Sequence, residues 1–392
     1  MKVSIINAGG NNDYIFGLVS GLSGIPHLEI EIIDSDISIG KLDRFSNVRL
    51  LPFIENYGYS VPFSTKIRRL IIYHGRLLSY AFRSESKIWH IQWENKFRFL
   101  DRLVLPLLYR VAGKKIVFTA HNVDADARAG RSSWYNRATL SFMYRRMDRI
   151  IAHTNSIKLE LMESFNVPGE KIAHIMHGIN SKPSTHAQTR ESARQVLQIP
   201  ACRKVLLIFG AIDRYKGTDI MIEALDLLRR DHPDIFLVIA GNSTKKAQYL
   251  RELNELVGSK GLKNNVRIEA RWIEDDEVDT FFLAADCVVL PYRKIFQSGV
   301  PFMAYRFGLP VIASRVGGLP EVVVEGETGL TCEPDAASLA LAISDYFRSD
   351  LFSSLEETKE RIKNWANNTF SWHRIGRETY QLYQELEASD CR

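Results

Sequence analysis

The sequence predicts an α/β protein with two doubly wound parallel sheets. Its 392 residues exceed what one hydrophobic core usually supports, so two domains of ordinary size are expected. Short apolar strands alternate with helical segments, which is the pattern of a parallel sheet covered by helices. The alternation pauses near Pro183 and then begins again. Ligands of such sheets bind beyond the carboxyl ends of the strands, so we expect two facing domains with a cleft between them.

The individual elements follow from apolar runs and from the residues that interrupt them. The first half opens on a strand from Lys2 to Ala8, a loop through Asp13 and a helix from Tyr14 to Leu22. Further strands are expected at 29–34, 88–92, 115–120 and 149–153, with helices between them. The second half predicts strands at 205–209, 236–240, 266–269, 287–290 and 311–313, and helices at 218–230, 247–258, 274–284 and from 300 through 305.

Composition narrows the class of protein. The charged and apolar fractions are those of a soluble globular protein, and no apolar run approaches the ~18 residues that a membrane span needs. The chain enters a strand directly after Met1, so no signal peptide is expected and we expect the protein to be cytoplasmic. The four cysteines lack metal-ligand spacing, and we expect them to be reduced, with two or three of them buried.

The charge is unevenly distributed. Residues 1–184 carry 25 Lys and Arg against 16 Asp and Glu, a net charge of +9, whereas the remainder carries 26 against 30, a net charge of −4. Much of the excess lies between Lys66 and Arg83, where basic residues alternate with Leu, Ile, Tyr and Phe at helical spacing. This pattern suits a helix on an anionic membrane surface, and equally a half-buried helix with a solvated basic face. No nucleic-acid-binding module accompanies the charge, so no nucleic acid is expected as a partner.

A loop in the second half has the composition of a phosphate-binding site. It comprises Gln297, Ser298, Gly299 and Val300, and a predicted helix follows it. Backbone N–H groups at such a helix start bind phosphate, and the Gln and Ser side chains supply neutral hydrogen bonds. In isolation, a plain turn before a helix is the better explanation of the loop, and the motifs that follow it reverse that preference. A diphosphate-bearing donor is the functional interpretation.

The surrounding motifs resemble the donor half of family 4 (GT4) glycosyltransferases of the GT-B type, which have two Rossmann-like domains. The resemblance rests on Gly308-Leu-Pro-Val-Ile-Ala-Ser314 and on Gly317-Gly-Leu-Pro-Glu321. Many members also carry a pair of glutamates, and Ile295 and Met303 stand at those positions here. The resemblance implies a first domain of residues 1–182, a donor domain of residues 183–370 and a C-terminal helix, 371–390, that crosses back to the first domain.

The resemblance also assigns roles to residues of the second half. Lys216 stands where the family has a lysine that neutralises the leaving diphosphate; Ala211 replaces the usual arginine, and Arg214 could reach the same phosphates. Fixed cations there stabilise the charge that develops as the sugar bond breaks. Two ordinary surface cations are the alternative. The remaining donor-binding candidates of the second half are Gly210, Asn242, Trp272 and Glu321, and Trp272 could equally be an interface residue.

The first half offers fewer candidates. His121 lies in a loop that resembles the family's histidine-containing loop near the reacting sugar, although a lone histidine is often structural. Gly9 and Gly10 would let the backbone approach the donor, and Gln92 and Trp93 suit an acceptor sugar. The two Asp-x-Asp triplets, at 34–36 and 124–126, are interpreted as solvated or helix-capping residues, so we expect no essential metal and no cofactor.

The family resemblance implies a retaining hexosyltransferase. The resemblance implies transfer of a hexose-type sugar from a nucleotide-diphosphate donor to a saccharide or lipid-linked saccharide acceptor, in bacterial surface-polysaccharide biosynthesis. The leaving phosphate would accept the proton of the acceptor hydroxyl. Peripheral contact with the inner face of the membrane fits the basic first half. A non-catalytic partner subunit of the same fold and a nucleotide-sugar epimerase remain alternatives, and a phosphorylase would require a cofactor-binding lysine context that the sequence lacks.

Overall fold

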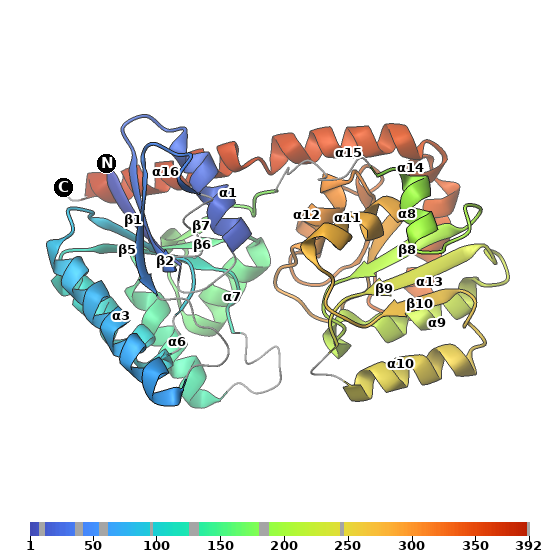
Figure 1. Ribbon diagram of the computed structural model, residues 1–392, viewed down its shortest axis with the longest axis horizontal. Helices are drawn as coiled ribbons and strands as arrows, with labels where there is room; N and C mark the ends of the chain where they lie inside the picture. The colour runs from blue at the N-terminus through green and yellow to red at the C-terminus, as the bar shows by residue number, and fades with distance from the viewer. Residues whose placement is uncertain are drawn as a thin grey trace. The chain divides into compact units, whose positions relative to one another are not determined.

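The computed structural model describes residues 1–7, 12–35, 42–54, 62–94, 97–124, 133–179, 188–243 and 247–389. The chain forms two compact units (Figure 1). The first unit comprises Met1–Gly178 together with Phe370–Arg392, and the second comprises Ile179–Thr369. The boundary that the sequence suggested at 182/183 falls within 180–187, which lie outside the described residues.

The first unit is built on a parallel sheet of seven strands in the order β3-β2-β1-β4-β5-β6-β7. Strands β1 and β5 in its interior are mostly apolar and are buried except for their first residues, as expected for a sheet covered on both faces. Its elements are β1 (Lys2–Ile6), α1 (Asn12–Ser23), β2 (Glu29–Ser35), β3 (Val48–Ile54), α3 (Phe63–Arg83), β4 (Ile88–Ile91), the π-helix η2 (Leu100–Val104), α4 (Leu105–Val111), β5 (Lys115–Ala120), α6 (Trp134–Arg146), β6 (Arg149–Ala152), α7 (Asn155–Phe165), η3 (Gly169–Lys171), β7 (Ile172–His174) and α16 (Trp372–Ala388).

The C-terminal helix α16 packs against α1 through glycines. A Cβ atom on Gly17 would lie 2.0 Å from the indole of Trp372, and one on Gly21 would lie 1.9 Å from the Trp372 carbonyl oxygen. The Trp372 ring also covers Gly178, where an added Cβ would approach to 2.4 Å. Only residues without side chains allow this contact, so these glycines tie the end of the chain to the first unit.

The second unit contains a parallel sheet of six strands in the order β10-β9-β8-β11-β12-β13. Helices α9, α10 and α13 cover one face of this sheet, and α8, α11 and α12 cover the other (Figure 1). Its elements are α8 (Arg190–Val196), β8 (Lys204–Phe209), η4 (Arg214–Lys216), α9 (Thr218–Leu228), β9 (Ile235–Ala240), α10 (Ala247–Ser259), β10 (Val266–Glu269), α11 (Asp275–Ala284), β11 (Cys287–Leu290), α12 (Val300–Arg306), β12 (Val311–Ser314), η5 (Leu319–Glu321), β13 (Gly329–Cys332), α13 (Ala336–Arg348), α14 (Asp350–Ser353) and α15 (Leu355–Thr369).

The predicted fold class is confirmed, and three strands were missed. Every strand expected from the sequence is present within two residues of its predicted ends. The missed strands are β3, β7 and β13, each at an edge of its sheet. Edge strands pair on one side only and need less apolar character, and β3 also contains Pro52.

Strand order locates the positions where ligands bind. In both sheets the chain proceeds outward in one direction and then reverses, between β1 and β4 in the first unit and between β8 and β11 in the second. A crevice forms at such a reversal, outside the carboxyl ends of the two strands. Gln92 and Trp93 follow β4, whereas Gly210 follows β8 and the 291–299 loop follows β11. These predicted site residues therefore lie at the reversal points.

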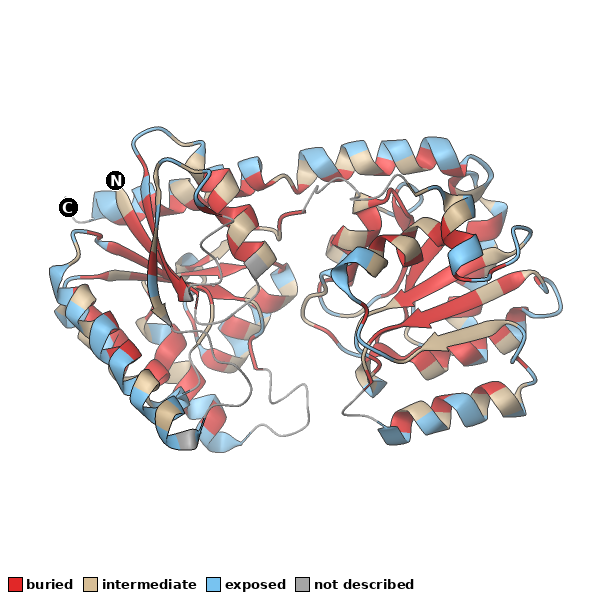
Figure 2. Ribbon diagram, in the orientation of Figure 1, coloured by how far each residue is buried: buried red, intermediate tan, exposed pale blue. Residues whose placement is uncertain are grey.

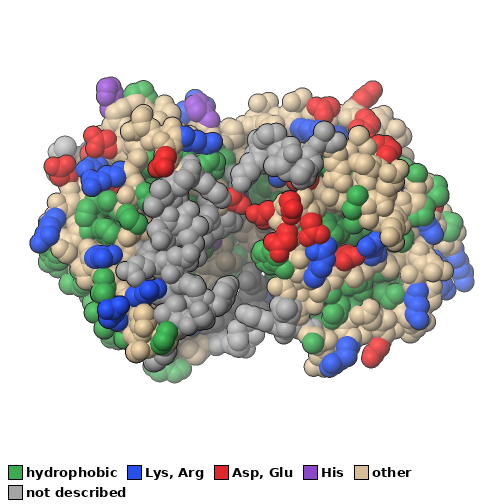
Figure 3. All heavy atoms as spheres, viewed as in Figure 1, with side chains coloured by type: hydrophobic (Ala, Val, Ile, Leu, Met, Phe, Trp, Pro, Cys, Tyr) green, Lys and Arg blue, Asp and Glu red, His purple; other side chains and the backbone are tan. Residues whose placement is uncertain are grey.

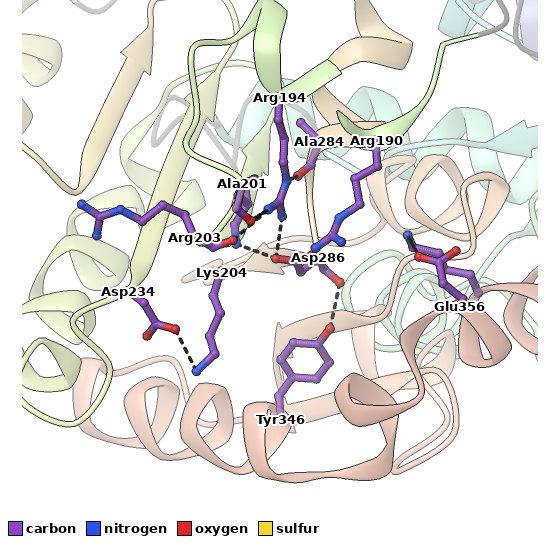
Figure 4. A network of polar contacts seen from close by, with 12 residues as sticks. Arg190, Arg194, Ala201, Arg203, Lys204, Asp234, Ala284, Asp286, Tyr346 and Glu356 are labelled. Atoms are coloured by element: carbon purple, nitrogen blue, oxygen red, sulfur yellow. Dashed lines mark hydrogen bonds and ion pairs between the residues drawn. The ribbon is translucent and has the colours of Figure 1, made fainter. Parts of the chain in front are cut away.

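The opposite end of the second sheet is held by a buried carboxylate (Figure 4). Asp286 precedes β11 and accepts hydrogen bonds from Arg190, from Arg194 at 2.9 Å and from the Val205 backbone N–H at 2.7 Å. The Tyr346 hydroxyl donates to the Asp286 carbonyl oxygen at 2.8 Å. A buried charge with this many partners is fully satisfied, so we interpret the network as structural.

Helix α3 presents a surface that is both apolar and basic. Tyr73, Leu77 and Ala81 face the core, whereas Ile71 is 67% exposed and Phe82 is 59% exposed. Figure 2 shows the pale blue exposed face of this helix, and Figure 3 shows basic and hydrophobic side chains side by side on the same part of the first unit. The 21 residues of α3 include no Asp or Glu. Among the described residues, no helix is long and apolar enough to cross a bilayer.

Candidate active site

The turn after β8 positions the lysine that the sequence singled out. Gly210 has φ +99°, and a Cβ there would lie 2.7 Å from the Nζ atom of Lys216. Lys216 is 6% exposed, and its ammonium group donates to the Phe209 carbonyl oxygen at 3.3 Å. The ammonium also lies 5.3 Å from the Tyr292 ring centroid. A glycine at 210 therefore leaves space for a buried cation at the carboxyl end of the central strand.

Arg214 has a different environment. Its guanidinium pairs with Glu252 on α10 and lies 5.0 Å from the Tyr249 ring centroid. Its side chain is 61% exposed, so this ion pair is screened by solvent. Arg214 is thus exposed and paired with a carboxylate, whereas Lys216 is buried. The two predicted cations are not equivalent.

The 295–299 loop is held by the Gly-Gly turn that follows β12. Gly317 has φ +54°, and a Cβ there would lie 1.6 Å from the Ile295 carbonyl oxygen. The Gly318 N–H donates to the Phe296 carbonyl oxygen at 3.2 Å. Ile295, which stands at the position of the first family glutamate, is buried. The Gly317-Gly318 motif, which helped to carry the family resemblance, is therefore in contact with the predicted phosphate-binding loop.

Ser298 and Gln297 have distinct surroundings in this loop. The Ser298 Oγ atom accepts from the Val300 N–H at 3.3 Å and shares a 3.4 Å hydrogen bond with the Tyr292 hydroxyl. Gln297 has a buried Oε1 atom with no hydrogen-bond partner among the described residues. A buried hydrogen-bond acceptor in the predicted phosphate-binding loop is suited to accept a hydrogen bond from a ligand. Gly299 is exposed at the loop tip, and Val300 begins α12.

The remaining donor-site candidates lie at the ends of neighbouring strands. Gly241, after β9, has φ +150°, and its added Cβ would lie 2.0 Å from the Gly210 carbonyl oxygen. The Asn242 carbonyl oxygen accepts from the Ile212 N–H at 2.9 Å, which braces the Lys216 turn. Trp272, after β10, is 63% exposed. Glu321 ends the 3₁₀ turn η5 and is half-buried.

Sequence reasoning missed a link between the donor loop and α9. Arg293 donates to both carboxylate oxygens of Asp219, at 2.9 and 2.8 Å, and the Tyr249 hydroxyl donates to the same carboxylate at 2.7 Å. Burial alone would raise the pKa of Asp219, but these hydrogen bonds outweigh it and lower the pKa. The bidentate pair fixes the loop after β11 to the first turn of α9. The arginine directly after Tyr292 was a signal that could have been used.

In the first unit, His121 lies parallel to Trp93. Their ring centroids are 4.0 Å apart with an interplanar angle of 3°. The His121 Nε2 atom lies 3.3 Å from the Gln92 Oε1 atom, which can only accept, so Nε2 carries the proton. The Nδ1 atom of His121 is then an acceptor in the neutral ring, suited to a hydroxyl donor. The structure thus brings together the three candidates His121, Gln92 and Trp93.

His121 belongs to a buried cluster of neutral histidines. Burial lowers the pKa of His90 and of His153 to about 3 and that of His177 to about 4. Burial, with the neighbouring histidines, also places the pKa of His121 well below its ordinary value. The His153 Nδ1 atom donates to the Ile175 carbonyl oxygen at 2.8 Å, and its Nε2 atom has no partner among the described residues. The cluster favours uncharged imidazoles.

The candidates of the first unit line a pocket of about 400 Å³. The pocket is also lined by Glu94, Arg98, Arg102, Asp124 and Asn136, of which the sequence had singled out no arginine and had interpreted Asp124 as solvated or helix-capping. Glu94 comes directly after Trp93, and Asp124 lies three residues after His121. Their position beyond strand ends was the available signal. Burial raises the pKa of Glu94 despite the opposing effect of Arg102.

Some predicted residues have no described position. Gly9 and Gly10 lie outside the described residues, as do Asp36 and Asp126 of the two Asp-x-Asp triplets. Asp34 accepts from the Asn7 amide at 2.7 Å, and Asp124 accepts from the Asn136 amide at 2.9 Å. Over the described ranges, no three His, Cys, Asp or Glu side chains are grouped as a metal site. Cys287 and Cys332 are buried and unbridged, and Cys202 is exposed.

Comparison with curated proteins gives partial matches. D-inositol 3-phosphate glycosyltransferase of Corynebacterium diphtheriae is 31% identical over 228 residues, which cover 55% of this chain and 52% of that protein. Lipopolysaccharide core biosynthesis mannosyltransferase LpsB of Rhizobium meliloti is 27% identical over 267 residues, covering 67% of this chain and 70% of that protein. The first of these matches spans about half the length of the relative.

Solved structures share the whole fold. HepE of Anabaena, solved in complex with UDP, has a TM-score of 0.74 at 16% identity, with 98% of this chain and 100% of that chain covered. Sucrose-phosphate synthase of Thermosynechococcus elongatus has a TM-score of 0.72 at 20% identity, with 99% and 100% covered. At these identities the likeness establishes the fold, which is of the GT-B type.

Two family models match successive parts of the chain. The model described as Glycosyltransferase Family 4 matches residues 50–182, in the first unit and the segment that follows it. The model described as Glycosyl transferases group 1 matches residues 189–369, which form nearly all of the second unit. Together the two matches span most of the sequence, and the chain belongs to the group 1, family 4 glycosyltransferases.

Proposed function

We propose that the protein is a retaining glycosyltransferase that moves a hexose-type sugar from a nucleotide diphosphate to a saccharide or lipid-linked saccharide. The observation that carries the proposal is the buried ammonium of Lys216 at the reversal point of the second sheet. A buried cation beyond the carboxyl ends of the strands, at the reversal point of the sheet, suits a diphosphate. The UDP complex of HepE supports a nucleotide donor.

The roles of the other donor-site residues follow from their positions. The backbone of Ser298, Gly299 and Val300 binds the diphosphate together with Lys216. The Oε1 atom of Gln297 accepts a hydrogen bond from the nucleotide sugar. Exposed Trp272 stacks on the nucleotide base. Arg214 would first have to leave Glu252, so we assign it a secondary role.

In the proposed reaction the acceptor oxygen forms a bond to the anomeric carbon as the carbon–phosphate-oxygen bond breaks. Attack occurs on the face from which the nucleotide diphosphate departs, and a diphosphate oxygen takes the proton of the acceptor hydroxyl. Lys216 stabilises the negative charge that develops on the leaving group. His121 orients a sugar hydroxyl through its Nδ1 atom. Lys216 supplies positive charge at the diphosphate, and we propose that no metal ion or cofactor is required.

Names among the relatives suggest the biological setting. LpsB is described as a lipopolysaccharide core biosynthesis mannosyltransferase, and a solved relative, WaaG, as involved in lipopolysaccharide biosynthesis. Bacterial surface-polysaccharide assembly is therefore the proposed process. The apolar and basic surface of α3 fits peripheral contact with an anionic membrane, where a lipid-linked acceptor would be found.

Thermal-shift measurements test the donor site. We expect one class among UDP-, GDP-, CDP-, ADP- and dTDP-sugars to raise the melting temperature, because a ligand that binds only the folded state stabilises it. The shift should disappear in Lys216→Ala.

A non-catalytic partner subunit is the second candidate, favoured by Ile295 and Met303 at the positions of the family glutamates. Absence of a shift with every nucleotide sugar would favour that candidate.

A further inference from the structure

The pocket of the first unit contains a buried polar network that the donor chemistry does not use. The Arg102 Nε atom donates to the Glu94 Oε2 atom at 2.8 Å. The Arg102 Nη1 atom donates to Asn136 Oδ1 at 2.8 Å and to Thr139 Oγ1 at 3.1 Å. The Asn136 amide in turn donates to Asp124 Oδ1 at 2.9 Å. The network thus joins the segment after β4, the π-helix η2, the loop after β5 and helix α6.

The network fixes the charge of the pocket. The lining includes two carboxylates, Glu94 and Asp124, and two guanidinium groups, Arg98 and Arg102, so the formal charges cancel. Arg102 is 5% exposed and already donates to three side chains, which leaves it poorly placed to bind an incoming anion. The two carboxylates offset the attraction that the guanidinium groups would exert on an anion. The pocket therefore has no excess of positive charge with which to bind an anionic ligand.

The rest of the lining suits a sugar ring. Trp93, Phe118 and Tyr144 provide apolar ring surfaces, and Gln92 and His121 provide neutral hydrogen-bonding groups. Glu94 binds Arg102 through Oε2, so its Oε1 atom remains to accept from a ligand hydroxyl. A volume of about 400 Å³ falls within the usual range of small-ligand pockets, about 300–1,000 Å³.

We propose that this pocket binds an uncharged sugar residue of the acceptor and that Glu94, oriented by Arg102, determines specificity by accepting a hydroxyl of that sugar. Only the identification of the bound sugar as the acceptor rests on the proposed function. Sugar binding to the pocket does not depend on transfer. A lipid diphosphate, where the acceptor carries one, would remain outside the pocket, because the lining has no excess of positive charge to bind phosphate.

Saturation-transfer NMR without any nucleotide tests the proposal. The probes are the methyl glycosides of glucose, galactose, mannose and N-acetylglucosamine, compared with glucuronic acid and glucose 6-phosphate at equal concentration. We expect at least one uncharged glycoside to bind and both anionic sugars to bind at least tenfold more weakly. Glu94→Gln should weaken the glycoside by about tenfold, since hydrogen bonds to charged groups are the stronger ones. Glu163→Gln, at an exposed position of α7, is the matched control and should bind as the wild type does.

A second variant tests the proposal independently in case Glu94→Gln does not fold. Trp93→Phe keeps an aromatic surface and leaves the Arg102 network intact, and should weaken glycoside binding by a smaller factor than Glu94→Gln. Equal or tighter binding of the anionic sugars would overturn the proposal, as would unchanged binding in a folded Glu94→Gln or no binding of any uncharged glycoside. If the protein binds a glycoside but shows no thermal shift with any nucleotide sugar, the sugar-binding pocket is supported and the transferase function is rejected.

Discussion

The His121 imidazole and the Trp93 indole are stacked in parallel, 4.0 Å between centroids, on the wall of the first-unit pocket. Tyr14 lies edge-on to the same imidazole, with 4.6 Å between centroids. These two rings exclude water from His121 on two sides, which explains why burial keeps the pKa of this histidine well below its usual range. His121 is therefore suited to neutral hydrogen bonding.

The first prediction concerns the pH dependence of activity. With the donor that the thermal shift identifies, kcat/KM should show no histidine titration near pH 6.5, because His121 stays uncharged there. His121→Ala should lower kcat/KM by roughly 3- to 15-fold, the value of one neutral hydrogen bond. His373→Gln, at an exposed position of α16, is the control and should keep the wild-type kcat/KM. A step in activity centred near pH 6.5 that vanishes in His121→Ala would contradict the assignment.

The second prediction separates the two cations of the second unit. Lys216→Ala should lower kcat/KM by at least about tenfold, and by up to about 10³-fold if the ammonium contributes as much as an oxyanion-hole donor does. Arg214→Ala should have a smaller effect, because Arg214 is exposed and paired with Glu252. Steady-state kinetics of both variants provide the test. Equal losses in the two variants would show that Arg214 leaves Glu252 to bind the phosphates.

Sequence patterns were sufficient for the interior of both sheets. Central strands such as Lys115–Ala120 and Cys287–Leu290 are nearly all apolar because both faces are covered, and their ends were predicted correctly. The edge strands Val48–Ile54, Ile172–His174 and Gly329–Cys332 were missed, since pairing on one side allows polar residues and proline. Local periodicity carries little information about pairing.

The candidate site was predicted where it depends on strand ends and missed where it depends on tertiary contacts. Lys216, Gln92 and Trp93 follow strands at the reversal points, which the alternation of elements locates. The partner of Arg214 is 38 residues away in sequence, and the bidentate contact of Arg293 with Asp219 spans 74 residues. No local pattern encodes such pairs.

The third prediction compares two glycines with positive φ. Gly317→Ala places a Cβ at 1.6 Å from the Ile295 carbonyl oxygen, whereas the Cβ of Gly326→Ala would meet nothing within 4 Å. Gly326→Ala should therefore cost only the backbone strain, about 1–2 kcal/mol in the free energy of unfolding. Gly317→Ala should cost distinctly more and should also displace the 295–299 loop. Urea unfolding and nucleotide-sugar thermal shifts measure both effects. Equal destabilisation by the two variants would contradict the close approach.

The fourth prediction concerns stability against pH. His90, His153 and His177 have folded pKa values of about 3, 3 and 4, below the unfolded value of about 6.5, so the unfolded chain binds more protons. Their contribution is fully present above pH 6.5 and is lost as the pH falls toward 4. Each histidine contributes a slope of up to about 1.4 kcal/mol per pH unit.

Urea unfolding between pH 7 and 5 measures that slope before most carboxylates titrate. His153→Gln should reduce the slope by one histidine's contribution, whatever its effect on stability at neutral pH. His373→Gln, at an exposed position of α16, is the matched control and should keep the wild-type slope. An unchanged slope in His153→Gln would mean that this imidazole titrates in the folded protein as it does in the unfolded chain.

The fifth prediction concerns membrane contact through α3. Ile67 and Ile71 are one helical turn apart, Phe82 lies three turns further on the same side, and all three are exposed. Arg76 and Arg83 are seven residues apart, share another side of the helix and are exposed as well. An amphipathic helix of this kind binds anionic bilayers through both buried apolar area and attraction to the headgroups, with about 1 kcal/mol per basic residue near the surface.

Sedimentation with vesicles distinguishes the two contributions. The protein should bind vesicles that contain phosphatidylglycerol and bind pure phosphatidylcholine vesicles weakly. The double variant Arg76→Glu, Arg83→Glu should bind the anionic vesicles at least tenfold more weakly than the wild type. The double variant Ile71→Ser, Phe82→Ser should also bind at least tenfold more weakly than the wild type at high salt, where the electrostatic attraction is screened. Arg251→Glu, on an exposed position of α10, is the control for a general change in charge and should bind as the wild type does. If the α3 variants and Arg251→Glu bind alike, the exposed face of α3 is a solvated surface with no membrane role, and the net charge of the protein accounts for any binding.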